Sequence, residues 1–284
     1  MQKAIQEFLH YLEQVQGCAQ NTILAYENDL MQFQRFINEG SSHAVGPDSY
    51  SQDRAEIYRA RLSQEGYRPS TFYRKLAAVR SYLDYLREKG MLGVVAMSEQ
   101  LRPSPMERKM PLVLSRDAIG KLLKAPANLD SPMALRDRAI LELIYRTGLR
   151  ASDIANLKLE NVNFDLASLH AAGRICALEE AIEPIREYID SGRPHLALNH
   201  EERALFLNQR GKGLTRQGIW LIVKRWSEVA ELGEGVSPHT IRHSLVTHLL
   251  EDGRTVREVQ IKLGMKSPNS IRIFTAAHRK AGSD

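Results

Sequence analysis

Two stretches of the sequence hold side chains that could do chemistry together. In RTGLRASDIANL, Arg150 follows a glycine turn and opens a new helix. In SPHTIRHSLVTHLL, a Ser–Pro pair starts a helix, which places His239 and Arg242 one turn apart on one helix face. An arginine can bind an anion, and a histidine can carry a proton. Taken singly, however, each arginine also fits a surface or ion-paired role, and each histidine fits a core or surface role.

The composition is that of a globular protein with room for two domains. The 284 residues are 43% hydrophobic and 26% charged, and the formal net charge is +5. This modest basic excess suits a polyanionic partner but is too small to identify one. Cys18 and Cys176 are far apart and form no metal-binding pattern. No apolar run approaches the length of a membrane span, and the charged N-terminal stretch is not a signal peptide, so we expect a cytoplasmic protein.

Residues 1–90 have the apolar periodicity of helices. The four predicted helices cover 5–15, 19–40, 52–66 and 68–90. The last of these carries Arg74, Lys75 and Arg80 among aromatic residues. This pattern fits either a solvated charged face or a surface that contacts phosphates.

Three prolines in the stretch 91–111 break the helical pattern and mark a domain boundary. We place an N-terminal helical domain at 1–95, a linker at 96–111 and a second domain at 112–284. The second domain has the pattern of further helices, with strands possible over 164–180. The predicted fold class is therefore mainly α, with little sheet.

Together these stretches resemble the tyrosine recombinases of the phage integrase family, and most closely those of the Xer type. The similarity runs from NTILAYENDL and LAAVRSYLDYLREKG through MPLVLS and LRDRAILELIYRTGLRASDIANL to GRPHL and VSPHTIRHSLVTHLL. TGLR alone is a weak signal, whereas TGLR ahead of HTIRH and behind a helical domain is specific. The resemblance implies a helical core-binding (SAM-like) domain and a mostly α catalytic-like domain with a small sheet, which is shortened here.

The resemblance also implies a reaction on DNA, in which a tyrosine attacks a phosphodiester bond during site-specific recombination or integration. The motif assigns stabilisation of the phosphate charge to Arg150 and Arg242. His239 matches a histidine that handles a proton, and Asp153 stands where an acid orients Arg150. The implied partner is double-stranded DNA, with a second recombinase protomer or a homo-oligomer on it. No metal or other cofactor is implied.

Several positions around that phosphate depart from the family pattern. Phe274 stands at the position of the nucleophilic tyrosine, and a phenyl ring has no nucleophilic atom. Met265 replaces a histidine or tryptophan that donates a hydrogen bond to the phosphate. Arg174 stands at the position of a lysine that acts as general acid, and a guanidinium is a poor proton donor. The sequence also stops ten residues after Phe274, where relatives usually continue with a helix that docks on a neighbouring protomer, so we expect exchange between subunits to be impaired.

Basic and amide side chains in both domains are candidates for DNA contact: Arg74, Lys75, Arg80, Arg216, Gln217, Lys224 and Arg225. The stretch GLTRQGIWLIVKRW resembles a family helix that enters DNA. Arg216 and Gln217 stand at its start, where they fit reading of a base edge or contact with a phosphate.

Three functions fit these observations. The interpretation that we favour is a Xer-like DNA-binding protein associated with recombination but defective in strand cleavage. The second is an active recombinase, which would need an engineered Phe274 or an unconventional nucleophile such as Thr275 or a water activated by His278. The third is a structural or interaction protein without a DNA role, which the basic charge and the two intact arginines disfavour.

Overall fold

The computed structural model of the chain describes residues 2–18, 20–39, 52–92, 101, 111–129, 131–199 and 201–265. The chain divides into two compact units, Met1–Arg108 and Lys109–Asp284. The division falls within 96–111, the stretch assigned to a linker, while the domain limits at 95 and 112 stay a prediction. Over the described residues, no helix combines the length and the apolar character that crossing a membrane would require.

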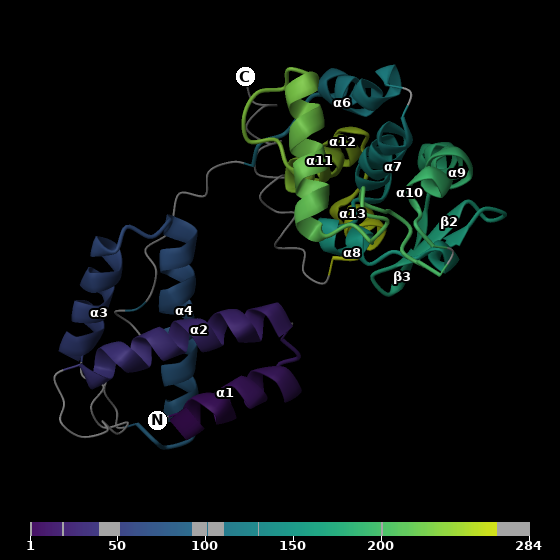
Figure 1. The fold of residues 1–284 in the computed structure, drawn as a ribbon. Helices are drawn as coiled ribbons and strands as arrows, with labels where there is room; N and C mark the ends of the chain where they lie inside the picture. The colour runs from purple at the N-terminus through teal and green to yellow at the C-terminus, as the bar shows by residue number, and fades with distance from the viewer. Residues whose placement is uncertain are drawn as a thin grey trace, which may run out of the picture. The chain divides into compact units, whose positions relative to one another are not determined.

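The first unit is built from helices (Figure 1). Their buried sides form a core rich in aromatic residues. Its described helices are α1 (Gln2–Gln14), α2 (Gln20–Asn38), α3 (Gln52–Gln64) and α4 (Pro69–Glu88). Phe8, Phe33, Tyr58 and Tyr82 are almost completely buried, and Phe8 packs against Tyr82 with ring centroids 5.5 Å apart. The helical N-terminal domain predicted from the sequence is confirmed.

The second unit is also mainly helical (Figure 1). Its described α-helices are α6 (Arg116–Lys124), α7 (Pro132–Thr147), α8 (Ala151–Ala155), α9 (Ile182–Glu187), α10 (Arg193–Leu196), α11 (Arg216–Val229), α12 (Pro238–Glu251) and α13 (Val256–Lys262). Shorter helical turns are η2 (Ala125–Asn128), η3 (Leu159–Asn161), η4 (Glu179–Ala181) and the π-helical η5 (Tyr188–Gly192). Helix α7 packs against α9, α11 and α12, and its Ile140 and Leu143 are fully buried. Trp226 of α11 donates its indole N–H to Oδ2 of Asp137 at 2.8 Å, which joins α11 to α7.

A small antiparallel sheet follows α8 in the chain. Its strands, in the order β1–β2–β3, are β1 (Val162–Asn163), β2 (Ser168–Ala171) and β3 (Arg174–Ala177). Ala171 pairs with Arg174, so a two-residue turn of Ala172 and Gly173 joins β2 to β3. Both turn residues have positive φ, 52° and 71°, as a type I′ hairpin turn requires. The predicted small sheet is confirmed, and it puts Arg174 at the first position of β3.

Candidate functional site

The junction between α7 and α8 determines where Arg150 leaves the fold. Helix α7 ends at Gly148, whose φ of 60° lies in the left-handed region that favours glycine. A Cβ on this residue would lie 2.2 Å from Cδ2 of Leu263, so the close packing also needs glycine. Arg150 caps α8, and its backbone N–H donates to Oδ2 of Asp153 at 3.0 Å. Asp153, the acid predicted to orient Arg150, therefore accepts a hydrogen bond from the Arg150 backbone. The Arg150 side chain is exposed.

The start of α12 fixes His239 and Arg242. Oγ of Ser237 accepts a hydrogen bond from the backbone N–H of Thr240 at 3.3 Å. Pro238 occupies the first helical position, where its fixed φ suits the helix and its missing N–H costs nothing. The Ser–Pro helix start predicted from the sequence is confirmed. It places His239 in the first turn of α12 and Arg242 in the next.

Arg242 is a buried cation held at two helix ends. The residue is 7% exposed. Its guanidinium donates to the carbonyl oxygen of Gly148 and, at 3.4 Å, to that of Leu263. These carbonyls end α7 and α13, where the unsatisfied acceptors and the helix dipole favour a positive charge. Arg242 therefore ties α12 to both helix ends.

Arg174 reaches the same two helix ends from the sheet. Its Nη1 donates to the carbonyl oxygen of Lys262 at 2.5 Å, and its Nη2 donates to that of Thr147 at 3.2 Å. Its stem lies against Gly264, where a Cβ would come within 2.7 Å of the Arg174 Cδ. The side chain at the predicted lysine position thus joins β3 to α7 and α13.

The charges of Arg150 and Arg174 act on the buried guanidinium of Arg242. Burial, together with the charges of Arg150 and Arg174, lowers the pKa of Arg242 to about 10, while Asp153 opposes the shift. Arg242 therefore stays protonated at neutral pH. Three guanidinium groups near one carboxylate leave a local excess of positive charge. Such a cluster suits a tetrahedral anion with several oxygens, since each guanidinium can donate paired hydrogen bonds.

His239 lies beside this cluster. Partial removal of water lowers its pKa, and the charges of Arg216, Arg242 and Arg150 lower it further. The ring is therefore neutral at neutral pH, and one of its nitrogens can accept a hydrogen bond while the other donates one. The effect of Arg216 shows that the N-terminus of α11 is close enough to act on the same site.

Helix α11 presents the other predicted DNA-contact residues of the second unit. Oγ1 of Thr215 accepts from the backbone N–H of Gly218 at 3.1 Å and caps the helix. The predicted contact residues on α11 are all exposed: Arg216, Gln217, Lys224 and Arg225. Lys224 is partly engaged by its own helix, since its Nζ lies 3.9 Å from Glu228 and 5.7 Å from the ring centroid of Trp220.

Met265 lies at the end of the described chain, just after α13. Its backbone N–H donates to the carbonyl of Gln260 at 3.0 Å, and its own carbonyl accepts from Nε2 of Gln260 at 3.1 Å. Its side chain packs against the small apolar cluster that includes Val259 and Leu263. A thioether in this place cannot donate a hydrogen bond to an anion. Phe274 lies outside the described residues.

Lys75, a predicted DNA contact of the first unit, is a buried side chain paired with an acid. Lys75 is 8% exposed, its Nζ lies 3.0 Å from Oδ1 of the buried Asp29, and it donates to Oε1 of Gln32 at 2.5 Å. The same carboxylate accepts from Arg74, which also donates to a backbone carbonyl of α2 at 3.2 Å. Arg80 remains partly exposed, 3.8 Å from Asp84. The basic residues of α4 are thus largely neutralised within the first unit.

Sequence reasoning missed two cations immediately before α11. Arg210 and Lys212 are exposed on the turn 208–213. The signal was present as NQRGKG, in which a glycine follows each of two cations just ahead of the Thr215 helix cap.

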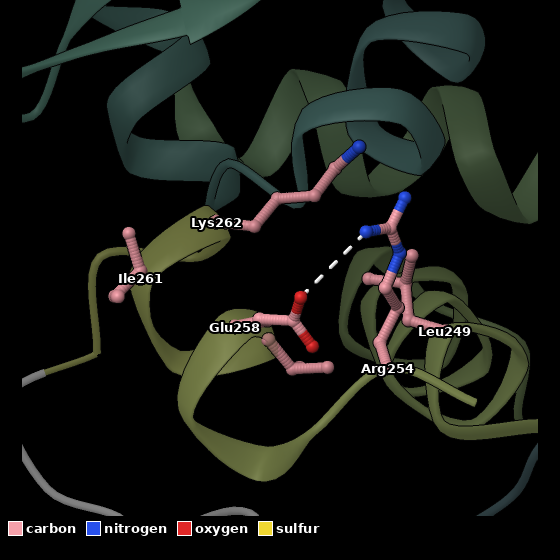
Figure 2. A pocket seen from close by; sticks show the side chains of 6 residues that line it. Leu249, Arg254, Glu258, Ile261 and Lys262 are labelled. Carbon is pink, nitrogen blue, oxygen red and sulfur yellow. Dashed lines mark ion pairs between the residues drawn. The ribbon is translucent and has the colours of Figure 1, made fainter. Parts of the chain in front are cut away.

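A shallow groove of about 320 Å³ lies beside α13 (Figure 2). It is lined by Leu249, Arg254, Glu258, Val259, Ile261 and Lys262. Arg254 and Glu258 form an ion pair at 3.7 Å across its middle. The Lys262 ammonium lies 2.7 Å from Glu179, while its carbonyl accepts from Arg174, so the groove and the arginine cluster share the end of α13.

Comparison with known proteins defines the class to which this fold and site belong. Residues 113–280 match the phage integrase family, and residues 5–90 match the phage integrase N-terminal SAM-like domain. The chain belongs to the phage integrase family.

Similar proteins within the family are tyrosine recombinases of the Xer type. The tyrosine recombinase XerC of Herpetosiphon aurantiacus is 34% identical over 281 residues, which cover 97% of this chain and 90% of that protein. The tyrosine recombinase XerD of Listeria innocua is 33% identical over 282 residues, covering 97% of this chain and 94% of that protein. The Xer-type resemblance predicted from the sequence is confirmed.

Solved structures show the same fold. XerH site-specific recombinase, bound to a palindromic difH substrate in a post-cleavage complex, aligns with a TM-score of 0.73 at 19% identity, covering 99% of this chain and 87% of that one. A lambda integrase dimer bound to a core site aligns with a TM-score of 0.68 at 14% identity, covering 96% and 94%. Both likenesses support the mainly α fold class.

Proposed function

We propose that this protein binds double-stranded DNA at a recombination site and cleaves it weakly or not at all. The observation that carries the proposal is the cluster in which Arg174 and Arg242 meet at the ends of α7 and α13 and Arg150 adds its charge. Its excess positive charge is suited to a DNA phosphate. The similar XerH is a site-specific recombinase bound to its difH substrate, and lambda integrase is bound to a core site, in their solved structures.

The arginine cluster retains donors for a phosphate. A guanidinium has five N–H groups. Among the described residues, the carbonyls of Gly148 and Leu263 take two donors of Arg242, and those of Lys262 and Thr147 take two of Arg174. The carbonyl bonds therefore hold both guanidinium planes while leaving N–H groups for an anion. This preorganisation lowers the entropy that binding would otherwise cost.

Three positions lack the side chains that strand cleavage requires. Phe274 has no hydroxyl to attack phosphorus, so no covalent phosphotyrosyl bond can form there. Met265 offers no donor to the developing charge. Arg174 is bound to two carbonyls, and its guanidinium is too weak an acid to protonate the leaving 5′-oxygen. The residues that bind a phosphate thus persist where those that react with it do not.

The proposed partner is double-stranded DNA in the cytoplasm, on which a second recombinase protomer or a second copy of this chain could also bind. Arg216 and Gln217 at the start of α11 would contact the duplex next to the arginine cluster. Arg80 of α4 is also partly exposed and would have the same role.

A gel shift with a salt titration tests the binding. The protein should retard duplex DNA at low salt, and the binding constant should fall steeply as salt rises, because neutralised phosphates release counterions. An intact protein that retards no duplex at any salt concentration would overturn the proposal. Strand cleavage is read on a denaturing gel as a covalent protein–DNA adduct.

A further inference from the structure

We propose that the turn formed by residues 208–213 is a second phosphate-binding site, distinct from the arginine cluster and just before helix α11 in the chain. The proposal rests on the DNA-binding function proposed above. Its ligand is the sugar–phosphate backbone of double-stranded DNA, and its binding groups are the side chains of Arg210 and Lys212.

The turn is held by its own first residue. Oδ1 of Asn208 accepts from the backbone N–H of Arg210 at 2.8 Å and from that of Lys212 at 3.1 Å. The backbone N–H of Asn208 donates to the carbonyl of Lys212 at 2.7 Å, and its carbonyl accepts from Gly211 at 3.0 Å. A bridge between Leu207 and Gly213 closes the base of the turn. The two cations therefore start from a backbone that is already ordered.

The tip of the turn is also packed against a neighbouring segment. Gly211 has a φ of 65°, and a Cβ on it would lie 2.7 Å from Cγ of Leu198 and 2.9 Å from its backbone nitrogen. Only glycine fits this approach without a shift. Contact with Leu198 thus fixes the tip in place, and binding an anion there would require little further ordering.

The charges on the turn are not neutralised. Arg210 and Lys212 are both exposed, and neither side chain has an acidic partner among the described residues. Other exposed arginines of the second unit are paired with acids, among them Arg138 with Glu187 at 3.0 Å and Arg203 with Glu160 at 2.9 Å. Two unpaired cations on one rigid turn suit a polyanion with regularly spaced charges.

The turn adjoins the start of α11, where Arg216 acts on His239 beside the arginine cluster. Arg216 is four positions after Lys212, and its charge lowers the pKa of His239. Four residues of extended chain span at most about 14 Å. Since successive phosphates of one B-DNA strand rise by about 3.4 Å, this span corresponds to a few phosphates. The turn would therefore hold a phosphate of the same duplex near the one in the cluster.

The test is the salt dependence of DNA binding by an Arg210→Ala/Lys212→Ala protein. The probe is a short duplex of random sequence, and affinity is followed by fluorescence anisotropy. We expect weaker binding, and a plot of log K against log salt whose slope is about 2 less steep, since each lost phosphate contact contributes about 0.9. The control is Arg138→Ala/Arg203→Ala, which removes the same charge from paired positions and should keep the wild-type slope.

The outcomes separate this proposal from the proposed function. Wild-type slope and affinity in the Arg210/Lys212 variant, or an equal change in the control, would overturn the second site while DNA binding stands. Failure of the wild-type protein to bind the duplex would overturn both. Thermal unfolding is measured alongside. An Arg210→Gln/Lys212→Gln protein repeats the test if the alanine variant unfolds early, and a wild-type slope in it would equally reject the second site.

Discussion

Helix α4 and the junction of α7, α12 and α13 both bury basic side chains, but they treat the charge differently. In α4, the carboxylate of Asp29 neutralises Lys75 and Arg74. At the junction, Arg242 is held by neutral carbonyls, and the nearest other charges include two more arginines. The comparison teaches that the partners of a cation, more than its place on a helix, decide whether it is available to DNA.

The largest expected effect is a loss of stability, and it tests the buried ion pair of α4. Asp29→Ala would leave the Lys75 ammonium buried without its carboxylate and should lower the free energy of unfolding by about 3–5 kcal/mol. Urea unfolding followed by circular dichroism measures the loss. The control Asp84→Ala removes the exposed partner of Arg80 and should cost less than about 1 kcal/mol. Equal losses in the two variants would show that Lys75 is not held in a buried ion pair.

The second prediction concerns DNA affinity. Arg242→Ala removes charge-assisted donors from the centre of the cluster and should weaken binding by about 2–3 kcal/mol, roughly 30- to 150-fold. Arg74→Ala removes a cation that Asp29 already neutralises and should change affinity by less than about threefold. Anisotropy titrations at one salt concentration measure the DNA affinity of both variants. A similar loss for both would remove the distinction between the two regions.

The third prediction sharpens the role of Arg174. Gly264→Ala and Gly253→Ala both put alanine at a positive φ, 60° and 80°, and each should cost about 1 kcal/mol for that reason. Only the Cβ at Gly264 meets Arg174, whereas the one at Gly253 meets nothing within 4 Å. Thermal unfolding should therefore show a further loss of about 1 kcal/mol, and anisotropy a weaker affinity, for Gly264→Ala alone. Identical behaviour of the two variants would show that Arg174 is not held against that glycine.

The smallest expected effect is a pH dependence. As the pH falls, the stability of the fold should decrease while the affinity for DNA increases. The pKa of His239 is lower in the folded protein than its usual 6.5, so the unfolded chain takes up the proton first. Stability is therefore lost as the pH falls from about 6.5 through the lowered pKa. A bound phosphate favours the protonated ring, so DNA affinity should rise over the same window. Titrations of the wild-type and His239→Gln proteins check this, and a rise of equal size in both would exclude His239 as its source.

The sequence predicted the residues of the cluster because they lie in local motifs. A glycine turn before Arg150 and a Ser–Pro helix start before His239 and Arg242 are readable without a structure. The burial of Lys75 was readable in part. It lies three residues after Phe72 and four before Val79, on the apolar stripe of its own helix. Its partner Asp29, 46 residues earlier, carries no local signal.

Long-range backbone contacts could not be predicted. The carbonyls that hold Arg174 and Arg242 come from the ends of α7 and α13, and any residue type provides the same carbonyl. Only the three-dimensional packing decides which helix ends meet. The bonds that fix Arg174 at the hairpin are of this kind and carry no signal in the sequence.

The central claim is that this chain binds DNA without forming a covalent bond to it. The most direct measurement incubates the wild-type protein with a nicked suicide duplex and divides each sample between a native and a denaturing gel. We predict a retarded band on the native gel, weakened by salt, and no protein–DNA adduct on the denaturing gel. A covalent adduct of the wild-type protein, with Phe274 unchanged, would contradict the account.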